Sequence, residues 1–254
     1  MTPGVAPIGA ELDGVVALGV VSPHLDDAVL SCAQVLGAHP GSVVVTVFSG
    51  GPGVVDPLPP WDESAGFGPG DDVTAARRHE DEAALAALGA RAVHLGLWDH
   101  QYRNPSYGYE EPAGGLDEAV DTALAAAIGA HDSIATWLVP LGILHPDHRA
   151  TAAAALRLAR RRPELGWLVY EELPYHVAYG REAAKAAARL EQAGFTLEHV
   201  APGTGPAPAT GPSYRQVGKV AAIRCYASQV PALGEGVDQA VAGPEVLHRL
   251  VDAG

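Results

Sequence analysis

The sequence is poor in cysteine and has no long hydrophobic run. Cys32 and Cys225 form no CxxC pair, which argues against a redox motif or a zinc knuckle, and we predict inert thiols in helical segments. The longest apolar runs, such as residues 15–21, are far too short to span a bilayer. No basic segment precedes an apolar core near residue 1, as a signal peptide would require. These absences predict a soluble, cytoplasmic protein with no membrane partner.

Positive charge is scarce as well. Lysine and arginine total 16 against 30 acidic residues, a formal net charge of −14, and only Lys185 and Lys219 supply lysine. Nucleic-acid binding draws most of its free energy from clustered basic side chains. We therefore expect no DNA or RNA partner.

Short β-rich runs alternate with longer helical ones along the 254 residues. We expect strands over 15–21, 42–48, 92–97, 134–139, 165–171 and 195–200. Helices are expected up to Gly37 and over 74–88, 116–128, 145–162, 181–193, 213–226 and 244–253, with Thr74 as a cap and Gly89 as a stop. Residues 50–72 and 201–212 are predicted loops. This order predicts one Rossmann-like α/β domain over 1–254, whose mainly parallel sheet has helices on both faces and binds ligands beyond the carboxyl ends of its strands.

Two His/Asp-rich segments, PHLDD and HPDH, each follow an apolar strand and open a helix. His24 and Asp27 are spaced i, i+3, so both can face one point at the first turn, and His145 and His148 repeat that spacing. Two His and one Asp with an open fourth position suit a catalytic zinc ion, which lowers the pKa of a bound water to about 7. The pattern indicates a metal-dependent hydrolase.

Simpler explanations exist for each residue alone, because Asp often caps helices and a lone His is usually a hydrogen-bonded surface group. Two such segments, both between strand and helix, argue for a shared chemical role. The sequence lacks the motifs that mark other enzyme classes. The first strand leads into PHLDD rather than GxGxxG, and neither GxSxG nor GxxxxGK[ST] occurs.

Together the two segments resemble the paired signatures of the LmbE-like, or PIG-L, family of zinc-dependent N-deacetylases. The similarity extends to residues 45–52 (VTVFSGGP), 77–89, 95–103, 170–175 (YEELPY) and 226–229 (YASQ), and so covers most of the chain. The two His/Asp motifs are specific as a pair, whereas the other segments support family placement more than individual roles.

By position, the resemblance implies that His24, Asp27 and His148 bind the metal, a Zn²⁺ or a similar divalent ion such as Fe²⁺. Asp26, adjacent to these ligands, would be the general base.

The resemblance implies four further roles. A protonated His145 would stabilise the oxyanion, and Asp147 would orient the His145 ring and favour its protonation. Arg77 and Asp99 match positions thought to hold sugar hydroxyls. They also have simpler explanations, since Arg77 could pair with acids on the helix surface and Asp99 could cap a turn.

Departures from the family pattern concern the substrate. Members that act on small thiol precursors usually read HPDDE, but here Leu25 replaces the proline and Ala28 the glutamate. Ile143 stands where some members place a tyrosine thought to polarise the substrate carbonyl. The alternatives for that role are Tyr102, Tyr107 and Tyr109, although aromatic side chains in a loop more often cover the core.

The expected activity is removal of an N-acyl group, N-acetyl in the first instance, from an amino-sugar-containing small molecule or glycoconjugate. Asp26 would deprotonate the attacking water, the metal and His145 would share the developing charge, and either residue could protonate the leaving amine. A bell-shaped pH profile follows. A non-catalytic sugar-binding or regulatory homologue and an amidase on a non-sugar amide stay open, as does assembly into a homo-oligomer.

Overall fold

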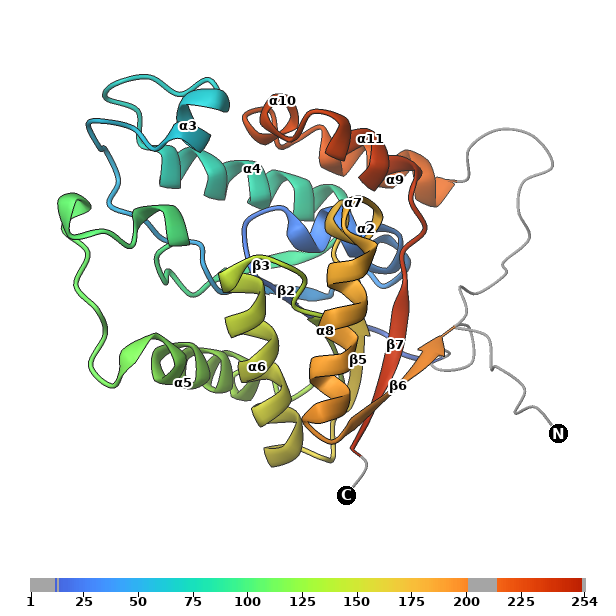
Figure 1. Cartoon of the computed structure of the whole chain (residues 1–254). Helices are drawn as coiled ribbons and strands as arrows, with labels where there is room; N and C mark the ends of the chain where they lie inside the picture. Colours follow the sequence, from blue (N-terminus) through green and yellow to red (C-terminus); the bar gives the residue numbers. More distant parts are fainter. Residues whose placement is uncertain (1–11, 13, 201–213, 253–254) are drawn as a thin grey trace, which may run out of the picture.

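A computed structural model of the protein describes residues 12, 14–200 and 214–252, whose strands form one sheet (Figure 1). The strand order is β3-β2-β1-β4-β5-β7-β6. The strands are β1 (Gly19–Ser22), β2 (Val43–Thr46), β3 (Arg91–His94), β4 (Thr136–Pro140), β5 (Gly166–Tyr170), β6 (Phe195–Val200) and β7 (Leu247–Asp252). The first five in this order pair in parallel, and β7 runs antiparallel to both of its neighbours. The mainly parallel sheet is as predicted, whereas the loop expected at 201–212 lies outside the described residues.

Helices cover both faces of this sheet (Figure 1). One face packs against α5 (Gly115–Gly129), α6 (Pro146–Arg161) and α8 (Gly180–Gln192). The other packs against α2 (Asp27–Ala38), α4 (Val73–Ala87), α9 (Tyr214–Ile223) and α11 (Glu235–Ala242). Shorter elements are α3 (Pro60–Ser64), η1 (His100–Tyr102), η2 (Pro105–Tyr107), α7 (Tyr175–Ala178) and α10 (Gln229–Leu233). The predicted fold class is confirmed, and the treatment of 1–254 as one domain stays a prediction.

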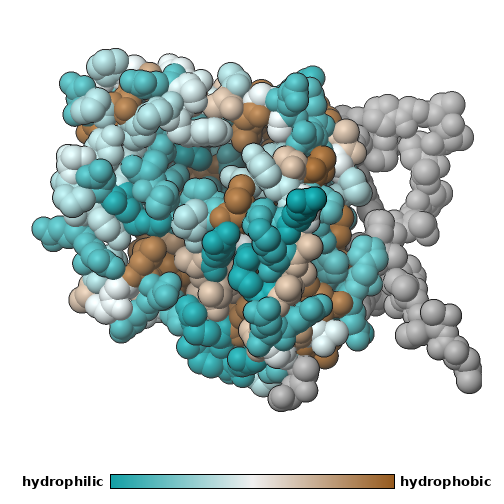
Figure 2. Space-filling model, in the orientation of Figure 1, coloured by the Kyte–Doolittle hydropathy of each residue, from teal (hydrophilic) through white to brown (hydrophobic). Residues whose placement is uncertain are grey.

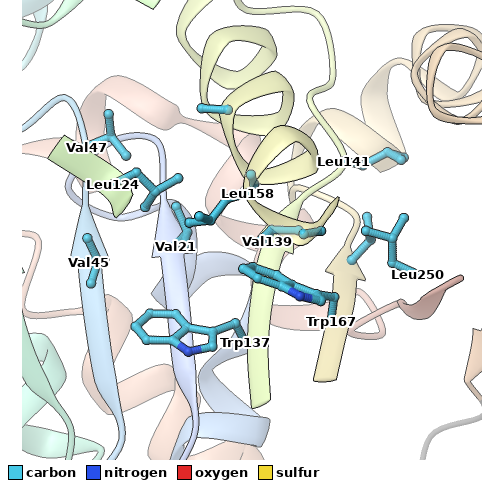
Figure 3. Packing of buried hydrophobic residues seen from close by; sticks show 14 of the residues in the cluster. Val21, Val45, Val47, Leu124, Trp137, Val139, Leu141, Leu158, Trp167 and Leu250 are labelled. Carbon is cyan, nitrogen blue, oxygen red and sulfur yellow. The ribbon is translucent and has the colours of Figure 1, made fainter. Parts of the chain in front are cut away.

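The central strands are apolar on both sides because each side faces a helical layer. Val21 and Val45 belong to the hydrophobic cluster under α5 and α6, which Figure 3 shows, while Val20 and Val44 belong to the cluster under α2. All four are fully buried. This double burial explains why the sequence runs here are continuous rather than alternating.

The helix predicted over 244–253 is wrong, because Leu247–Asp252 form strand β7. Leu247 and Leu250 are spaced i, i+3, which favours a helix in isolation. In the fold they point to opposite faces of the sheet, Leu247 into one cluster and Leu250 into the other. Pairing with β5 on one side and β6 on the other outweighs the local pattern.

Two smaller predictions change near α4. The segment 50–72 contains the short helix α3 and is not loop throughout. The cap of α4 is Asp72, whose side chain accepts from the Ala75 N–H at 3.0 Å, and not Thr74, which lies inside the helix. Gly89 does follow the helix with a φ of 71°, as predicted for a stop residue.

The face of the molecule that α6 and α8 form is largely polar (Figure 2). Figure 2 shows hydrophilic side chains over much of the face formed by α6 and α8, with hydrophobic residues in separate patches. Within the described residues, no helix is long and apolar enough to cross a membrane.

The carboxyl ends of the parallel strands bring distant segments together. After β2, Gly50 packs so closely on the segment after β3 that a Cβ atom at Gly50 would lie 2.1 Å from the Gly96 carbonyl oxygen. Glycine is therefore required at this crossing. The backbone N–H of Asp99 donates to the Gly50 carbonyl at 3.0 Å, which holds Asp99 beside the turns that follow β1 and β4.

Candidate active site

The turn between β1 and α2 is held by Ser22, whose hydroxyl donates to the His24 carbonyl at 2.7 Å and accepts from the Ala28 N–H at 3.0 Å. Asp26 is the N-cap of α2, yet its side chain makes no capping hydrogen bond. Its φ of 137° is a conformation that L-residues rarely adopt. Strain of this kind clusters at functional positions, and here it leaves the Asp26 carboxylate available for another use.

The three predicted metal ligands lie together. Asp27 Oδ2 is 3.4 Å from His24 Nδ1 and 3.2 Å from His148 Nε2. The same oxygen accepts from the His24 backbone N–H at 2.9 Å. All three residues are buried, and His148 has no exposed surface.

The His148 ring is oriented by Glu172, a residue that the sequence analysis did not single out. Glu172 Oε1 lies 3.1 Å from His148 Nδ1 and accepts from the N–H groups of Gly142 and Ile143 at 2.8 and 3.0 Å. A carboxylate can only accept, so Nδ1 carries a hydrogen. His148 Nε2 is then buried 3.2 Å from Asp27 with no hydrogen-bond partner among the described residues. An unpaired imidazole nitrogen beside a carboxylate suits a cation, and a set of two nitrogens and one oxygen is typical of catalytic zinc.

The electrostatics of this cluster also favour a positive charge between its members. Burial lowers the pKa of His148, but Asp27 and Glu172 outweigh that effect and raise it to about 9. Burial raises the pKa of Asp27, but His148 and His24 hold it well below its usual range. Asp27 is therefore ionised at neutral pH and available as a ligand.

Ligand atoms within 4.8 Å of one another define two overlapping groups of the described residues that could hold a metal ion: His24 with His145 and His148, and His24 with Asp99 and Asp147. Both groups contain His24, so the ring of His24 is the common point of the site.

Asp147 does not lie where the sequence analysis expected it. Its Oδ2 is 3.0 Å from His24 Nε2 and accepts from the His100 N–H at 3.0 Å, while Arg103 donates to its Oδ1. The contact with His145 runs instead through the Asp147 backbone N–H, which donates to His145 Nδ1 at 3.2 Å. His145 caps α6, and this use of its ring leaves the Asp147 carboxylate to orient His24.

The hydrogen bonding and electrostatics of His145 favour a neutral imidazole, whereas the resemblance implied a protonated one. Because its Nδ1 accepts a hydrogen bond, the ring hydrogen resides on Nε2. Burial and the charges of His24 and His148 lower the pKa of His145 to about 4. Its ring centroid is 4.8 Å from that of His24 and 5.5 Å from that of His148. A neutral imidazole can still donate Nε2–H to an oxygen in the cavity.

Asp26 has the acid–base properties of a general base. Burial and the neighbouring Asp27 raise the pKa of Asp26 to about 7, although Arg77 and His24 oppose the shift. A base is most effective when its pKa lies near the working pH. Asp26 meets that condition at neutral pH.

His24, Asp26, Asp27 and His145 line a cavity of about 220 Å³, and Arg77 and Asp99 form part of its wall. Arg77 Nη1 lies 3.5 Å from Asp99 Oδ2, and Arg77 Nε has no hydrogen-bond partner among the described residues. Arg77 is buried, so the alternative of a surface ion pair is wrong. Asp99 also caps η1, because its carboxylate accepts from the Gln101 N–H at 3.2 Å. The predicted capping role is therefore confirmed, and Asp99 lines the cavity as well.

The other wall comes from residues to which the sequence analysis gave no role. Trp61 of α3 donates from Nε1 to Gln229 Oε1 at 2.9 Å, and both line the cavity with Tyr175. Burial and the carboxylates of Asp27 and Asp26 raise the pKa of Tyr175 above its usual value, so its hydroxyl stays protonated. Tyr175 and Gln229 do fall within the segments 170–175 and 226–229 that resembled the family, and that was their only sequence signal.

Comparisons with solved structures identify related folds. A deacetylase triple mutant (Orf2*T) involved in the teicoplanin biosynthetic pathway is 26% identical, with 92% of this chain and 98% of that chain covered and a TM-score of 0.67. The zinc-inhibited form of teicoplanin deacetylase Orf2 is 27% identical, covers 84% of each chain and has a TM-score of 0.59. A40926 pseudoaglycone deacetylase Dbv21 is 24% identical, covers 94% of this chain and 98% of its own, and has a TM-score of 0.67, a likeness of fold alone.

No curated protein matches the sequence. The profile of the PIG-L family, described as GlcNAc-PI de-N-acetylase, matches residues 19–159, which include both His/Asp segments. The resemblance predicted from those segments is thereby confirmed. Since the match spans more than half of the chain, the protein belongs to the PIG-L family.

Proposed function

We propose that the protein is a metal-dependent hydrolase that removes an N-acyl group, N-acetyl in the first instance, from an amino-sugar-containing small molecule or glycoconjugate. The observation that carries the proposal is His148 Nε2, which makes no hydrogen bond among the described residues and lies 3.2 Å from Oδ2 of Asp27, a residue that lines the same cavity as Asp26. The teicoplanin deacetylases that this chain resembles support the reaction class.

His24, Asp27 and His148 would hold the metal. Asp27 Oδ2 is within 3.4 Å of both imidazoles, and the far sides of the two rings are engaged by Asp147 and Glu172. Carboxylates behind ligating histidines set the tautomer and increase ligand basicity. When bound, the divalent ion would supply Lewis acidity, which polarises the amide carbonyl and acidifies water.

Asp26 and His145 would divide the proton chemistry. Asp26 accepts a proton from the water that attacks the amide carbon, and His145 donates its Nε2–H to the carbonyl oxygen as that oxygen gains negative charge. When the C–N bond breaks, Asp26 returns the proton to the amine nitrogen. A neutral His145 has one ring hydrogen, already used on the oxygen, so Asp26 is the better donor. The products are a carboxylic acid and a free amine.

Arg77 and Asp99 would bind hydroxyl groups of the sugar, since a guanidinium offers donors and a carboxylate acceptors to the same cavity. A volume of about 220 Å³ is below the roughly 300–1,000 Å³ typical of sites that enclose a whole drug-sized ligand. The cavity therefore suits one acylated sugar unit. The rest of a conjugate would extend past Trp61, which is 38% exposed.

The proposal is tested by metal analysis joined to an acyl-release screen. Purified protein is stripped with a chelator, reloaded with Zn²⁺ or Fe²⁺, and assayed for acetate and free amine. Substrates are acetylglucosamine conjugates of inositol and of malate, chitobiose-type disaccharides and glycosylated natural products. We expect amine release that requires the metal and disappears in Asp27→Asn.

Each alternative predicts a different result in this screen. Sugar binding without release of acid by any metal form would indicate a non-catalytic homologue and overturn the proposal. Turnover of simple acetamides and not of acetylated sugars would indicate an amidase on a non-sugar amide. The matched control is Asp72→Asn, which removes a carboxylate from the exposed cap of α4.

A further inference from the structure

Tyr175 is the first residue of α7 and lines the cavity on the side of β5. Its ring centroid is 5.0 Å from that of His148, at an interplanar angle of 75°. Asp26, Asp27 and His145 line the same cavity. The phenol therefore lies within the group of side chains that would surround the reacting amide.

The Tyr175 hydroxyl has no hydrogen-bond partner among the described residues, so a protonated phenol in this cavity is available as a donor. Three other tyrosines differ from it. Tyr102 donates to Asp62 at 2.6 Å, Tyr170 to the Val21 carbonyl at 2.9 Å and Tyr226 to Asp81 at 2.7 Å. Those hydroxyls are already in use.

The two remaining tyrosines that the sequence suggested for the carbonyl are also placed elsewhere. The Tyr107 ring packs edge-on against Tyr102, the Tyr109 ring packs at a tilt against Trp98, and neither tyrosine lines the cavity. Ile143, with no exposed surface, is part of the hydrophobic core. The described residues thus offer one unengaged tyrosine hydroxyl at this site, on an element outside the segment 19–159 that matches the family.

We propose that the Tyr175 hydroxyl donates a hydrogen bond to the carbonyl oxygen of the substrate amide. This inference rests on the proposed N-deacylase function. The phenol keeps its proton throughout, and the hydrogen bond strengthens as the oxygen gains charge. A donor that acts mainly in the transition state changes kcat more than KM. Tyr175 would then be a catalytic residue of this chain.

The test compares Tyr175→Phe with Tyr179→Phe. Phenylalanine preserves the ring contact with His148 and removes only the hydroxyl. Tyr179 is a matched control because its ring centroid lies 6.4 Å from that of Tyr175, while its side chain is 50% exposed and does not line the cavity. Metal content and binding of acetate, measured by calorimetry, are determined for both variants beside kcat and KM.

We expect Tyr175→Phe to lower kcat about 10- to 100-fold, somewhat less than the roughly 10²–10³ seen for a principal oxyanion donor, with KM little changed. It should also bind acetate more weakly while retaining the wild-type metal content. Tyr179→Phe should match wild type in every measurement.

A Tyr175→Phe enzyme with wild-type kcat, or with a change in KM alone, would overturn this inference and leave the proposed function intact. Failure of the wild type to release any amine would instead count against the proposed function. A loss of metal in Tyr175→Phe would show that the hydroxyl supports the ion site and would also overturn the inference.

Discussion

The turn from β1 into α2 and the turn from β4 into α6 share one plan, in which a buried parallel strand ends in a His/Asp-rich segment that begins a helix. Their N-cap residues differ. Asp26 has a φ of 137° and no capping hydrogen bond, whereas His145 has a φ of −68° and accepts from the Asp147 N–H. One cap is strained and leaves its side chain free, and the other is relaxed and uses its ring to hold the helix.

The pKa values of the two caps move in opposite directions for related reasons. Asp26 is buried beside another carboxylate, so its pKa rises to about 7, while His145 is half-buried beside two imidazoles, so its pKa falls to about 4. Near neutral pH, Asp26 can exchange a proton and His145 remains a neutral donor. Paired groups whose environments separate their pKa values divide acid and base roles in many enzymes. Similar local sequences therefore acquire different chemistry from the residues that surround them in the fold.

The largest effect should come from Asp27→Asn, which removes the charged oxygen between His24 and His148 and keeps the side-chain shape. We expect metal binding to weaken by more than the roughly 10–100-fold typical of residues behind the ligands, with activity lost in parallel. Elemental analysis after dialysis measures the loss, and circular dichroism checks the fold. Full occupancy in the folded variant would exclude Asp27 as a ligand.

The next effect concerns the neighbouring carboxylate. Asp26→Asn should keep the metal and lower kcat about 10²–10⁴-fold, the range for a general acid–base group. In wild type, activity should fall as the pH drops below about 7, because Asp26 becomes protonated. The variant should lose that acid limb. A pH–rate profile with an unchanged acid limb would assign the base to another residue.

At the second turn, His145→Ala should lower kcat roughly 10²–10³-fold with KM little changed, as for loss of one oxyanion donor. The acid limb near pH 7 should remain, because Asp26 sets it. His79→Ala, at an exposed position on α4, is the control for loss of an imidazole. An acid limb that moved with His145→Ala would show that the two caps titrate together.

The smallest effect is on stability. The pKa of Asp26 is about 7 in the folded state, against about 3.9 for an Asp in an unfolded chain. The folded protein therefore binds this proton more tightly than the unfolded chain does, and the free energy of unfolding falls as the pH rises from about 4 to 7. Metal-free Asp26→Asn should therefore melt at a higher temperature than wild type at pH 8, and the difference should vanish near pH 4. Equal melting temperatures at pH 8 would contradict the burial cost assigned to Asp26.

A companion variant, Asp26→Gly, separates strain from charge at the same position. Glycine accepts a φ of 137° without a Cβ penalty, so it should relieve strain of about 1–3 kcal/mol in addition to removing the charge. The melting temperature should then exceed wild type at pH 4 as well. A difference confined to high pH would show that the backbone there is unstrained.

Much of the fold was predictable because its signals are local. The apolar runs before the PHLDD and HPDH segments become β1 and β4, and the strand expected over 195–200 has those bounds. The helix expected over 244–253 failed because Leu247 and Leu250 serve opposite faces of a sheet whose partners lie far along the chain. Spacing alone cannot distinguish that arrangement from one face of a helix.

The candidate site was likewise predictable only in part. Two short motifs identified His24, Asp27 and His148. The fold brings the rings of His24 and His148 within 3.4 Å of Asp27 Oδ2, and the metal-binding roles stay predictions. The family resemblance implied that Asp147 orients His145. The structure joins its carboxylate to His24, 123 residues away, because the Asp147 backbone serves the helix cap.

The sequence by itself determined the alternation of strands and helices, the two His/Asp segments and the family, since each depends on residues close together in the chain. Only the tertiary structure decided which carboxylate stands behind which histidine, that the pKa of His145 is lowered, and that Tyr175 and the Trp61–Gln229 pair, 168 residues apart, complete the cavity. Burial and neighbouring charge set the pKa and the hydrogen-bond partner of a side chain, and both arise when elements distant in sequence pack around the carboxyl ends of a parallel sheet.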